Sequence, residues 1–367
     1  MTDPRDTPPP PDDGAPRPPT APVDPGLLLR PPPALADAWP GTRPFRLTGW
    51  LERSGFTPGW TALLVFVLTF FVFQVVGGIA VAVVAAVEIA RTGGDAPPDP
   101  AAILASITDR PYLLLSSNAA GQWVGFALVS ILVARLHSPD WAGFLRLRRP
   151  PDWSGLALAG LGWLAIAPLV QWLGRLNEAL PLPPRLQEFE TMQLEMLEQL
   201  LLGANLNPWF LLLAVAVTPA VCEELLFRGY LQRQTERVGG TLVSIVLVGV
   251  VFGLYHLRFS QALPLATLGV YLGFVVWATG SLWAGVLVHL LNNGAAVLAT
   301  SYVAARPDLD PAMIEDLPVP WYLGLLSLGV TLALCARLAA RRRAACGDRP
   351  DAAPLADPAP PLSALSS

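Results

Sequence analysis

The chain has 367 residues, of which 53% are hydrophobic and only 14% are charged, and its mean hydropathy is +0.48. A soluble domain carries roughly 25% charged residues, so this composition excludes a soluble globular protein and predicts an integral membrane protein. The formal net charge of −4 says little, because the charges lie in tails and loops, and we expect no nucleic-acid partner.

The basic residues indicate the kind of organism, and the cysteines indicate whether disulfides or a zinc site are expected. All 24 basic residues are arginine, which together with the abundance of Ala, Pro and Gly suggests GC-rich coding and a bacterial protein. Cys222, Cys335 and Cys346 form neither a CxxC pair nor a zinc-binding spacing. Nothing in the cysteine pattern therefore predicts a disulfide framework.

Both ends of the chain are rich in proline. Residues 1–45 contain 15 prolines with scattered Asp and Arg, and the last twenty residues are of similar composition. Such segments bury too little apolar surface to form a core. We predict disordered cytoplasmic tails at residues 1–55 and 343–367, flanking a transmembrane domain at residues 56–342.

The apolar segments between the tails predict an all-α, polytopic membrane protein with about eight transmembrane helices. A helix needs about 20 apolar residues to cross the hydrocarbon layer. The predicted helices lie near residues 61–90, 112–136, 154–176, 207–231, 241–257, 262–280, 281–303 and 319–340. The fifth is short, and only a Thr-Gly-Ser turn separates the sixth from the seventh. The first apolar run starts near Trp60, so we expect it to act as an uncleaved anchor.

The arginines predict the orientation of these helices. Arginine clusters lie in the segments 135–149, 228–237 and 341–343, whereas the segments 188–198 and 308–316 are acidic. Cytoplasmic loops carry the excess of basic residues. Eight helices with both termini in the cytoplasm place all three arginine clusters inside, as a multi-pass protein of the cell membrane would have them.

The acidic segment after the third helix has an amphipathic pattern. In RLQEFETMQLEMLEQLL, an apolar face is formed at helical spacing by Phe189, Met192, Met196 and Leu200, opposite a face rich in glutamate. This pattern is typical of a helix that lies in the membrane interface. Such a helix could also cover the outer mouth of the protein.

Ionisable side chains inside apolar segments are concentrated in three predicted helices. Glu223 and Glu224 lie in the fourth, His256 in the fifth and His289 in the seventh. Charges in hydrocarbon are costly, so they usually mark function or a buried pair. The third histidine, His137, lies in a basic loop and is expected to be solvated.

Helical geometry gives the two glutamates different surroundings. Glu224 and Arg228 are four residues apart, face the same way and stand in the favourable order for an ion pair. Glu223 is turned by about 100° around the helix, so we expect it to point into a polar cavity. A carboxylate there can serve as a general base near neutral pH.

The same spacing places His289 beside Asn293, and Phe252 beside His256. Counted from the cytoplasmic helix ends at about 1.5 Å per residue, Glu223 and His289 lie roughly 12 Å deep and His256 lies roughly 20 Å deep. Helix tilt could remove this mismatch.

Three short motifs contain these residues. EELLFR fits EExxxR, FGLYH fits FxxxH and HLLNN fits HxxxN, in that order on separate predicted helices. With these motifs the chain resembles the CAAX prenyl protease and bacteriocin-processing (CPBP, or Abi) family. The resemblance covers about residues 207–300, the expected catalytic core, while the other helices fit only as general family architecture.

The resemblance implies an intramembrane endopeptidase of the glutamate type. Glu223 and His256 would activate the attacking water, and His289 and Asn293 would stabilise the oxyanion. Supporting roles would fall to Glu224, Arg228 and Phe252. The implied partners are the lipid bilayer and a peptide or membrane-protein substrate, and no cofactor is implied.

Three alternatives remain open. The polar groups could form an interhelical network without chemistry, since Glu, His and Asn also hold membrane helices together. A zinc-dependent metalloprotease could use Glu223, His256 and His289 as ligands, although the chain contains no HExxH motif. A transporter or proton relay could use the same groups, although we find no internal repeat.

Overall fold

The computed structural model describes residues 47–91, 105–106, 108–198, 206–306 and 319–346. Every regular element in these ranges is helical: α1 (Trp50–Arg53), α2 (Pro58–Arg91), α4 (Pro111–Gln122), η1 (Trp123–Leu128), α5 (Val129–His137), α6 (Trp141–Phe144), α7 (Trp153–Glu178), α8 (Pro184–Glu198), α9 (Pro208–Leu211), η3 (Leu212–Val217), α10 (Thr218–Glu224), η4 (Leu225–Leu231), α11 (Gln232–Tyr255), η5 (Phe259–Gln261), α12 (Ala262–Thr279), α13 (Leu282–Ala304) and α15 (Trp321–Cys346). The segments η1, η3 and η4 are π-helical, and η5 is a 3₁₀ turn.

Seven helical stretches within the described residues are long and apolar enough to cross a membrane. They are Pro58–Arg91, Pro111–His137, Trp153–Glu178, Pro208–Tyr255, Phe259–Thr279, Leu282–Ala304 and Trp321–Ala345. The chain is therefore a multi-pass, all-helical membrane protein, as its composition predicts. These are seven continuous stretches where about eight helices were predicted, because the fourth and fifth predicted helices fall within one of them. The cytoplasmic location of the termini stays a prediction.

The difference in number arises at Gly240. The fourth and fifth predicted helices are joined in the continuous stretch Pro208–Tyr255, which is 48 residues long. At Gly240 the backbone leaves the helical region with φ 75° and ψ 177°, a conformation that only glycine adopts readily. The Ser244 hydroxyl donates to the Gln232 carbonyl at 2.8 Å, although twelve residues of straight helix would separate them by about 18 Å. The chain therefore reverses at Gly240 and the two arms pack side by side.

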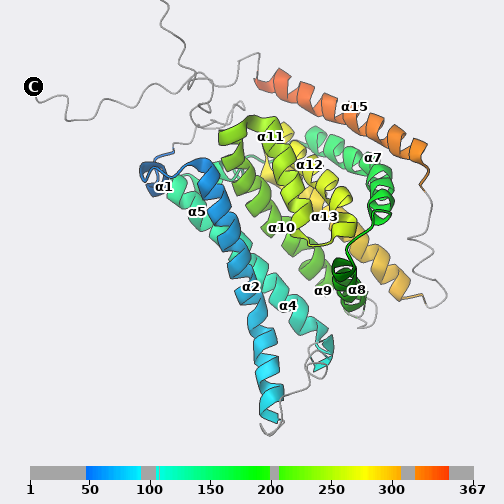
Figure 1. Cartoon of the computed structure of the whole chain (residues 1–367). Coiled ribbons are helices and arrows are strands. Elements are labelled where there is room, and N and C mark those ends of the chain that lie inside the picture. Colours follow the sequence, from blue (N-terminus) through cyan, green and yellow to red (C-terminus); the bar gives the residue numbers. More distant parts are fainter. Residues whose placement is uncertain (1–46, 92–104, 107, 199–205, 307–318, 347–367) are drawn as a thin grey trace, which may run out of the picture. The chain divides into compact units, whose positions relative to one another are not determined.

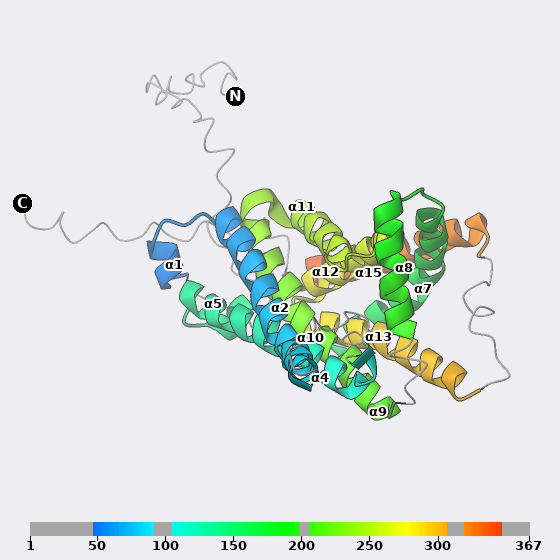
Figure 2. The same cartoon turned by 60° about the horizontal axis from the view of Figure 1, so that its bottom comes forward.

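The arm before Gly240 lies in the interior of the bundle. α10 packs against α4, η1 and α13, and η4 packs against α5 and α11. α12 bridges α11 and α7, and α7 packs against α15, an arrangement that can be followed in Figures 1 and 2. On the outer helix α2, Leu63, Val67 and Phe71 are exposed, as lipid-facing side chains are expected to be.

Glycines bring α11 and α12 into backbone contact. A Cβ atom on Gly249 would lie 2.6 Å from the Val270 nitrogen, and one on Gly253 would lie 2.7 Å from the Ala266 nitrogen. One on Gly269 would lie 2.8 Å from the Gly249 carbonyl oxygen. The GxxxG spacing in these two helices thus serves packing within the chain, as small residues do between membrane helices.

The structure corrects the expectation for His137, which is 2% exposed and not solvated. Its Nδ1 lies 2.7 Å from Glu52 Oε1, and its Nε2 lies 3.0 Å from the Tyr230 hydroxyl. Glu52 also accepts two hydrogen bonds from Arg237. Glu52 belongs to α1, so a helix is present near the end of residues 1–55, which were predicted as a tail. The predicted tails otherwise lie almost entirely outside the described residues.

The amphipathic segment forms a helix, α8 (Pro184–Glu198). Its apolar side chains Phe189, Met192 and Met196 are 37%, 56% and 42% exposed, so this face does not pack on the protein. An exposed apolar face is the arrangement expected of a helix in the membrane interface. Leu200, which was predicted to extend this face, lies outside the described residues.

Candidate active site

The predicted pair of Glu224 and Arg228 is present. Arg228 Nη1 donates to Glu224 Oε1 at 2.7 Å, and both side chains are 0% exposed. Arg228 Nη2 donates to the Gly269 carbonyl at 2.9 Å, and the guanidinium lies 4.3 Å from the Phe252 ring centroid. A buried charge needs this kind of compensation. The ion pair, the carbonyl and the aromatic face together supply it.

His289 joins the two glutamates across helices. Its Nδ1 lies 2.9 Å from Glu224 Oε1, and its Nε2 lies 4.0 Å from Glu223 Oε2. Because a carboxylate only accepts, Nδ1 carries the proton in the contact with Glu224. Nε2 is thereby directed toward Glu223. The expected separation of the two carboxylates is therefore incomplete, since one imidazole contacts both.

A glycine makes room for this contact. A Cβ atom on Gly285 would lie 2.8 Å from Glu224 Oε2, and Gly285 precedes His289 by one helical turn. Glu224 Oε2 is buried without a hydrogen-bond partner. The sequence carries a signal for this feature in the GxxxH spacing of the seventh predicted helix, but the pattern does not reveal that Glu224 lies opposite.

His256 lies at the C-terminal end of α11 and is connected to the cluster through Phe252. Its Nδ1 donates to the Phe252 carbonyl at 2.8 Å, which leaves Nε2 as the free acceptor in the neutral ring. The Phe252 ring packs edge-on against both imidazoles, with centroids 4.9 Å from His256 and 5.8 Å from His289. Among the described residues, Glu223 is within 4.0 Å of His289 but not of His256.

Asn293 lies one turn beyond His289 on α13. Its Nδ2 donates to the Val215 carbonyl at 3.3 Å, within the π-helical segment η3. Its Oδ1 accepts from Asn292 Nδ2 at 3.1 Å, and Asn292 in turn accepts from Trp163. The amide of Asn293 carries a second N–H, so one donor remains for a ligand in the site.

The residues named for the zinc alternative do not converge. Within the described part of the chain, no group of three or more His, Cys, Asp or Glu side chains is arranged to hold a metal ion. Glu223 and His289 approach each other at 4.0 Å, whereas His256 packs against the Phe252 ring and, among the described residues, forms no hydrogen bond or ion pair with either of them. The donor set therefore does not fit a tetrahedral zinc site with three protein ligands.

The residues of the candidate site lie in a part of the chain that matches a known family. A family model described as type II CAAX prenyl endopeptidase, Rce1-like, matches residues 205–295. Comparison with curated proteins and with solved structures gave no match. The matched range contains the three motifs and the whole cluster built around Glu224 and His289. Residues 205–295 therefore form a domain of the Rce1-like type II CAAX prenyl endopeptidase family.

Proposed function

We propose that the protein is an intramembrane endopeptidase that hydrolyses a peptide bond with a water molecule activated by Glu223 and His256. The observation that carries the proposal is the buried cluster in which His289 contacts Glu224 at 2.9 Å and approaches Glu223 at 4.0 Å. Arg228 forms its ion pair with Glu224, and Glu223 interacts with the guanidinium only at longer range. Glu223 is thereby the carboxylate left for chemistry.

In the proposed reaction, a water held between Glu223 and His256 loses a proton to Glu223 while its oxygen attacks the substrate carbonyl carbon. The negative charge that develops on the carbonyl oxygen is stabilised by the second amide N–H of Asn293 and by an N–H at Nε2 of His289. Because Glu224 already accepts the Nδ1 proton, this role requires His289 to be protonated on both ring nitrogens. Glu223 then delivers the proton to the departing amine. These steps convert the peptide and one water molecule into a carboxylic acid and an amine, regenerate Glu223 and need no further reactant.

Glu224 and Arg228 act through His289. A carboxylate that accepts the Nδ1 proton of an imidazole fixes the ring's orientation and stabilises its doubly protonated form, as the carboxylate of a Ser-His-Asp triad does. Phe252 separates the two imidazoles and covers the guanidinium. Chemistry without a metal is part of the proposal, because the donors do not converge on one point.

Comparative peptidomics of cells that express wild type or Glu223→Ala tests the proposal. We expect peptides or shortened membrane proteins that occur with the wild type and vanish with the variant. Glu195→Ala, which removes an exposed carboxylate on α8, should give the wild-type pattern. Indistinguishable peptide patterns from wild type and Glu223→Ala would contradict the proposal.

Metal dependence is tested with the purified protein in proteoliposomes. The probes are a quenched fluorescent farnesylated CAAX peptide and its unprenylated counterpart. We expect a strong chelator to leave cleavage unchanged. Loss of cleavage with recovery on addition of zinc would instead support the metalloprotease alternative.

A further inference from the structure

The segment that follows His256 has a backbone that needs outside support. Leu257 has a φ of 53°, in the left-handed region that a bulky side chain rarely adopts. Such a conformation persists only when the surrounding structure holds it. Leu257 is bonded directly to His256, so whatever holds this segment also holds the imidazole.

Two side chains from other helices bind the segment. Asn177, near the end of α7, donates to the Phe259 carbonyl at 2.9 Å and accepts from the Leu263 N–H at 2.8 Å. Glu190, on α8, accepts from the N–H groups of Phe259 and Ser260, the latter at 3.1 and 3.3 Å from its two oxygens. Both N–H groups open the 3₁₀ turn before α12, where a carboxylate is favoured.

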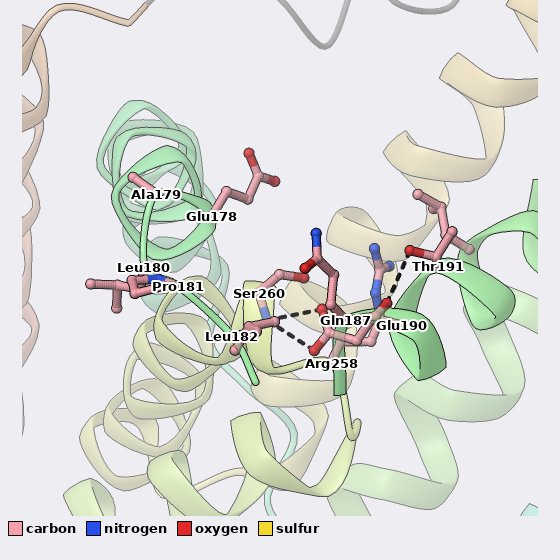
Figure 3. A pocket seen from close by; sticks show the side chains of 11 residues that line it. Glu178, Ala179, Leu180, Pro181, Leu182, Gln187, Glu190, Thr191, Arg258 and Ser260 are labelled. Carbon is pink, nitrogen blue, oxygen red and sulfur yellow. Dashed lines mark hydrogen bonds between the residues drawn. The ribbon is translucent and has the colours of Figure 1, made fainter. Parts of the chain in front are cut away.

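Glu190 is turned toward the protein although it belongs to a helix with little other attachment. None of the side chains described on α8 is buried, and its apolar face is exposed. Figure 3 shows Glu190 bonded to Ser260 beside Arg258, on the wall of a cavity of about 380 Å³ between the end of α7 and α8. The carboxylate therefore links α8 to the segment that begins at His256.

We propose that Glu190 is a positioning residue for the proteolytic reaction, which fixes His256 by holding the N–H groups of Phe259 and Ser260. The inference rests on the proposed function, since it assumes that His256 works on the attacking water. A displacement of about 1 Å in a reacting group can cost 100-fold in rate. Loss of the Glu190 contact therefore acts on turnover and not on substrate binding.

Kinetics of the proteoliposome reaction with the farnesylated CAAX peptide test this role. Glu190→Ala should lower kcat by ~10- to 100-fold at nearly unchanged KM. Glu190→Gln should recover part of the rate, because its amide oxygen still accepts an N–H. The matched control is Glu188→Ala on the same helix, whose exposed side chain makes no hydrogen bond among the described residues; it should behave as wild type.

A spectroscopic measurement separates positioning from overall damage. The chain contains three histidines, so ring-labelled protein gives three sets of imidazole signals, which can be assigned with single His→Gln variants. In Glu190→Ala and Glu190→Gln, the His256 signals should shift while those of His137 stay in place. Unchanged His256 signals in both variants overturn the inference, whatever happens to kcat. If the His256 signals shift in the variants but the wild type cleaves neither peptide, Glu190 still positions His256. That result would count against the proposed function and not against the positioning.

Discussion

At the scale of single residues, Oε1 of Glu224 accepts hydrogen bonds from two different helical elements of the site. It accepts from Arg228 Nη1 at 2.7 Å and from His289 Nδ1 at 2.9 Å. Glu223, the adjacent residue, has one ion-pair contact among the described residues, with His289 Nε2 at 4.0 Å, and interacts with Arg228 only at longer range. The two neighbouring carboxylates thus differ in their partners: Glu224 forms the ion pair with Arg228, and Glu223 forms no direct ion pair with an arginine among the described residues.

This distinction predicts opposite effects of the two alanine variants. Glu224→Ala leaves Arg228 buried without its counter-ion, which should lower the free energy of unfolding by ~3–5 kcal/mol. Glu223→Ala removes a carboxylate that forms no direct ion pair with Arg228, so its unfolding should stay close to wild type while cleavage is lost. Thermal unfolding in detergent, with cleavage measured on the same samples, checks both. Equal losses of stability in the two variants would contradict the assignment.

The pairs within one helix could be predicted from the sequence, because Glu224–Arg228 and Phe252–His256 follow from the four-residue repeat of the helix. The contact of His289 with Glu224 could not, because it depends on how α10 and α13 pack. His137 was predicted wrongly for the same reason. Its position at the end of an apolar run does not reveal that Glu52 and Tyr230 meet it there.

At the scale of elements, the contact between α11 and α12 places the Gly269 carbonyl where Arg228 donates to it. Gly249 and Gly269 allow backbone contact between the two helices, and the carbonyl of Gly269 accepts from Arg228. A side chain that separates the helices would move this carbonyl away from the guanidinium. The packing of α11 on α12 is therefore coupled to the Glu224–Arg228 pair.

Gly249→Ala tests this coupling. Its Cβ would lie 2.6 Å from the Val270 backbone nitrogen, so the helices must separate, and we expect a loss of ~1–3 kcal/mol in stability. Gly160→Ala on α7, where a Cβ meets nothing within 4 Å, is the matched control. Unfolding in detergent should distinguish the two variants clearly. A Gly249→Ala protein as stable as the control would show that the close approach has no energetic role.

The elements themselves were largely predictable, since apolar length marks membrane helices. Separate helices were predicted near residues 207–231 and 241–257, on either side of Gly240. The sequence did not reveal that residues 232–239 are also helical or that Ser244 lies against Gln232, because contacts between the two arms decide this. The contact that α8 makes with the rest of the protein through Glu190 was also not predicted. Amphipathicity indicates where the apolar face lies, but not that Glu190 finds two backbone N–H groups on another element.

At the scale of the whole molecule, a second polar cluster joins elements far apart in the sequence. Glu52 of α1 binds His137 at the end of α5 and Arg237 of α11. Burial alone would raise the pKa of Glu52, but the hydrogen bonds from His137 and Arg237 lower it to about 2. The cluster lies outside the three motifs, and we assign it to stability.

The lowered pKa predicts acid sensitivity of the fold. A carboxylate with a depressed pKa in the folded state contributes stability that is present above its ordinary pKa of 4.5 and is lost as the pH falls toward about 2. Stability of the wild type should therefore decline across this window, and Glu52→Gln should show a shallower decline. Glu188→Gln, an exposed control on α8, should keep the wild-type slope. Identical slopes for wild type and Glu52→Gln would rule out this contribution.

The whole account depends on Glu223 as the base of a proteolytic site, and one measurement tests that most directly. Initial rates of peptide cleavage are compared in proteoliposomes for wild type, Glu223→Gln and Glu195→Gln, with folding verified by thermal unfolding. Loss of a general base should lower the rate by ~10²- to 10⁴-fold in Glu223→Gln, whereas Glu195→Gln should cleave as wild type does. Wild-type cleavage by folded Glu223→Gln would contradict the account.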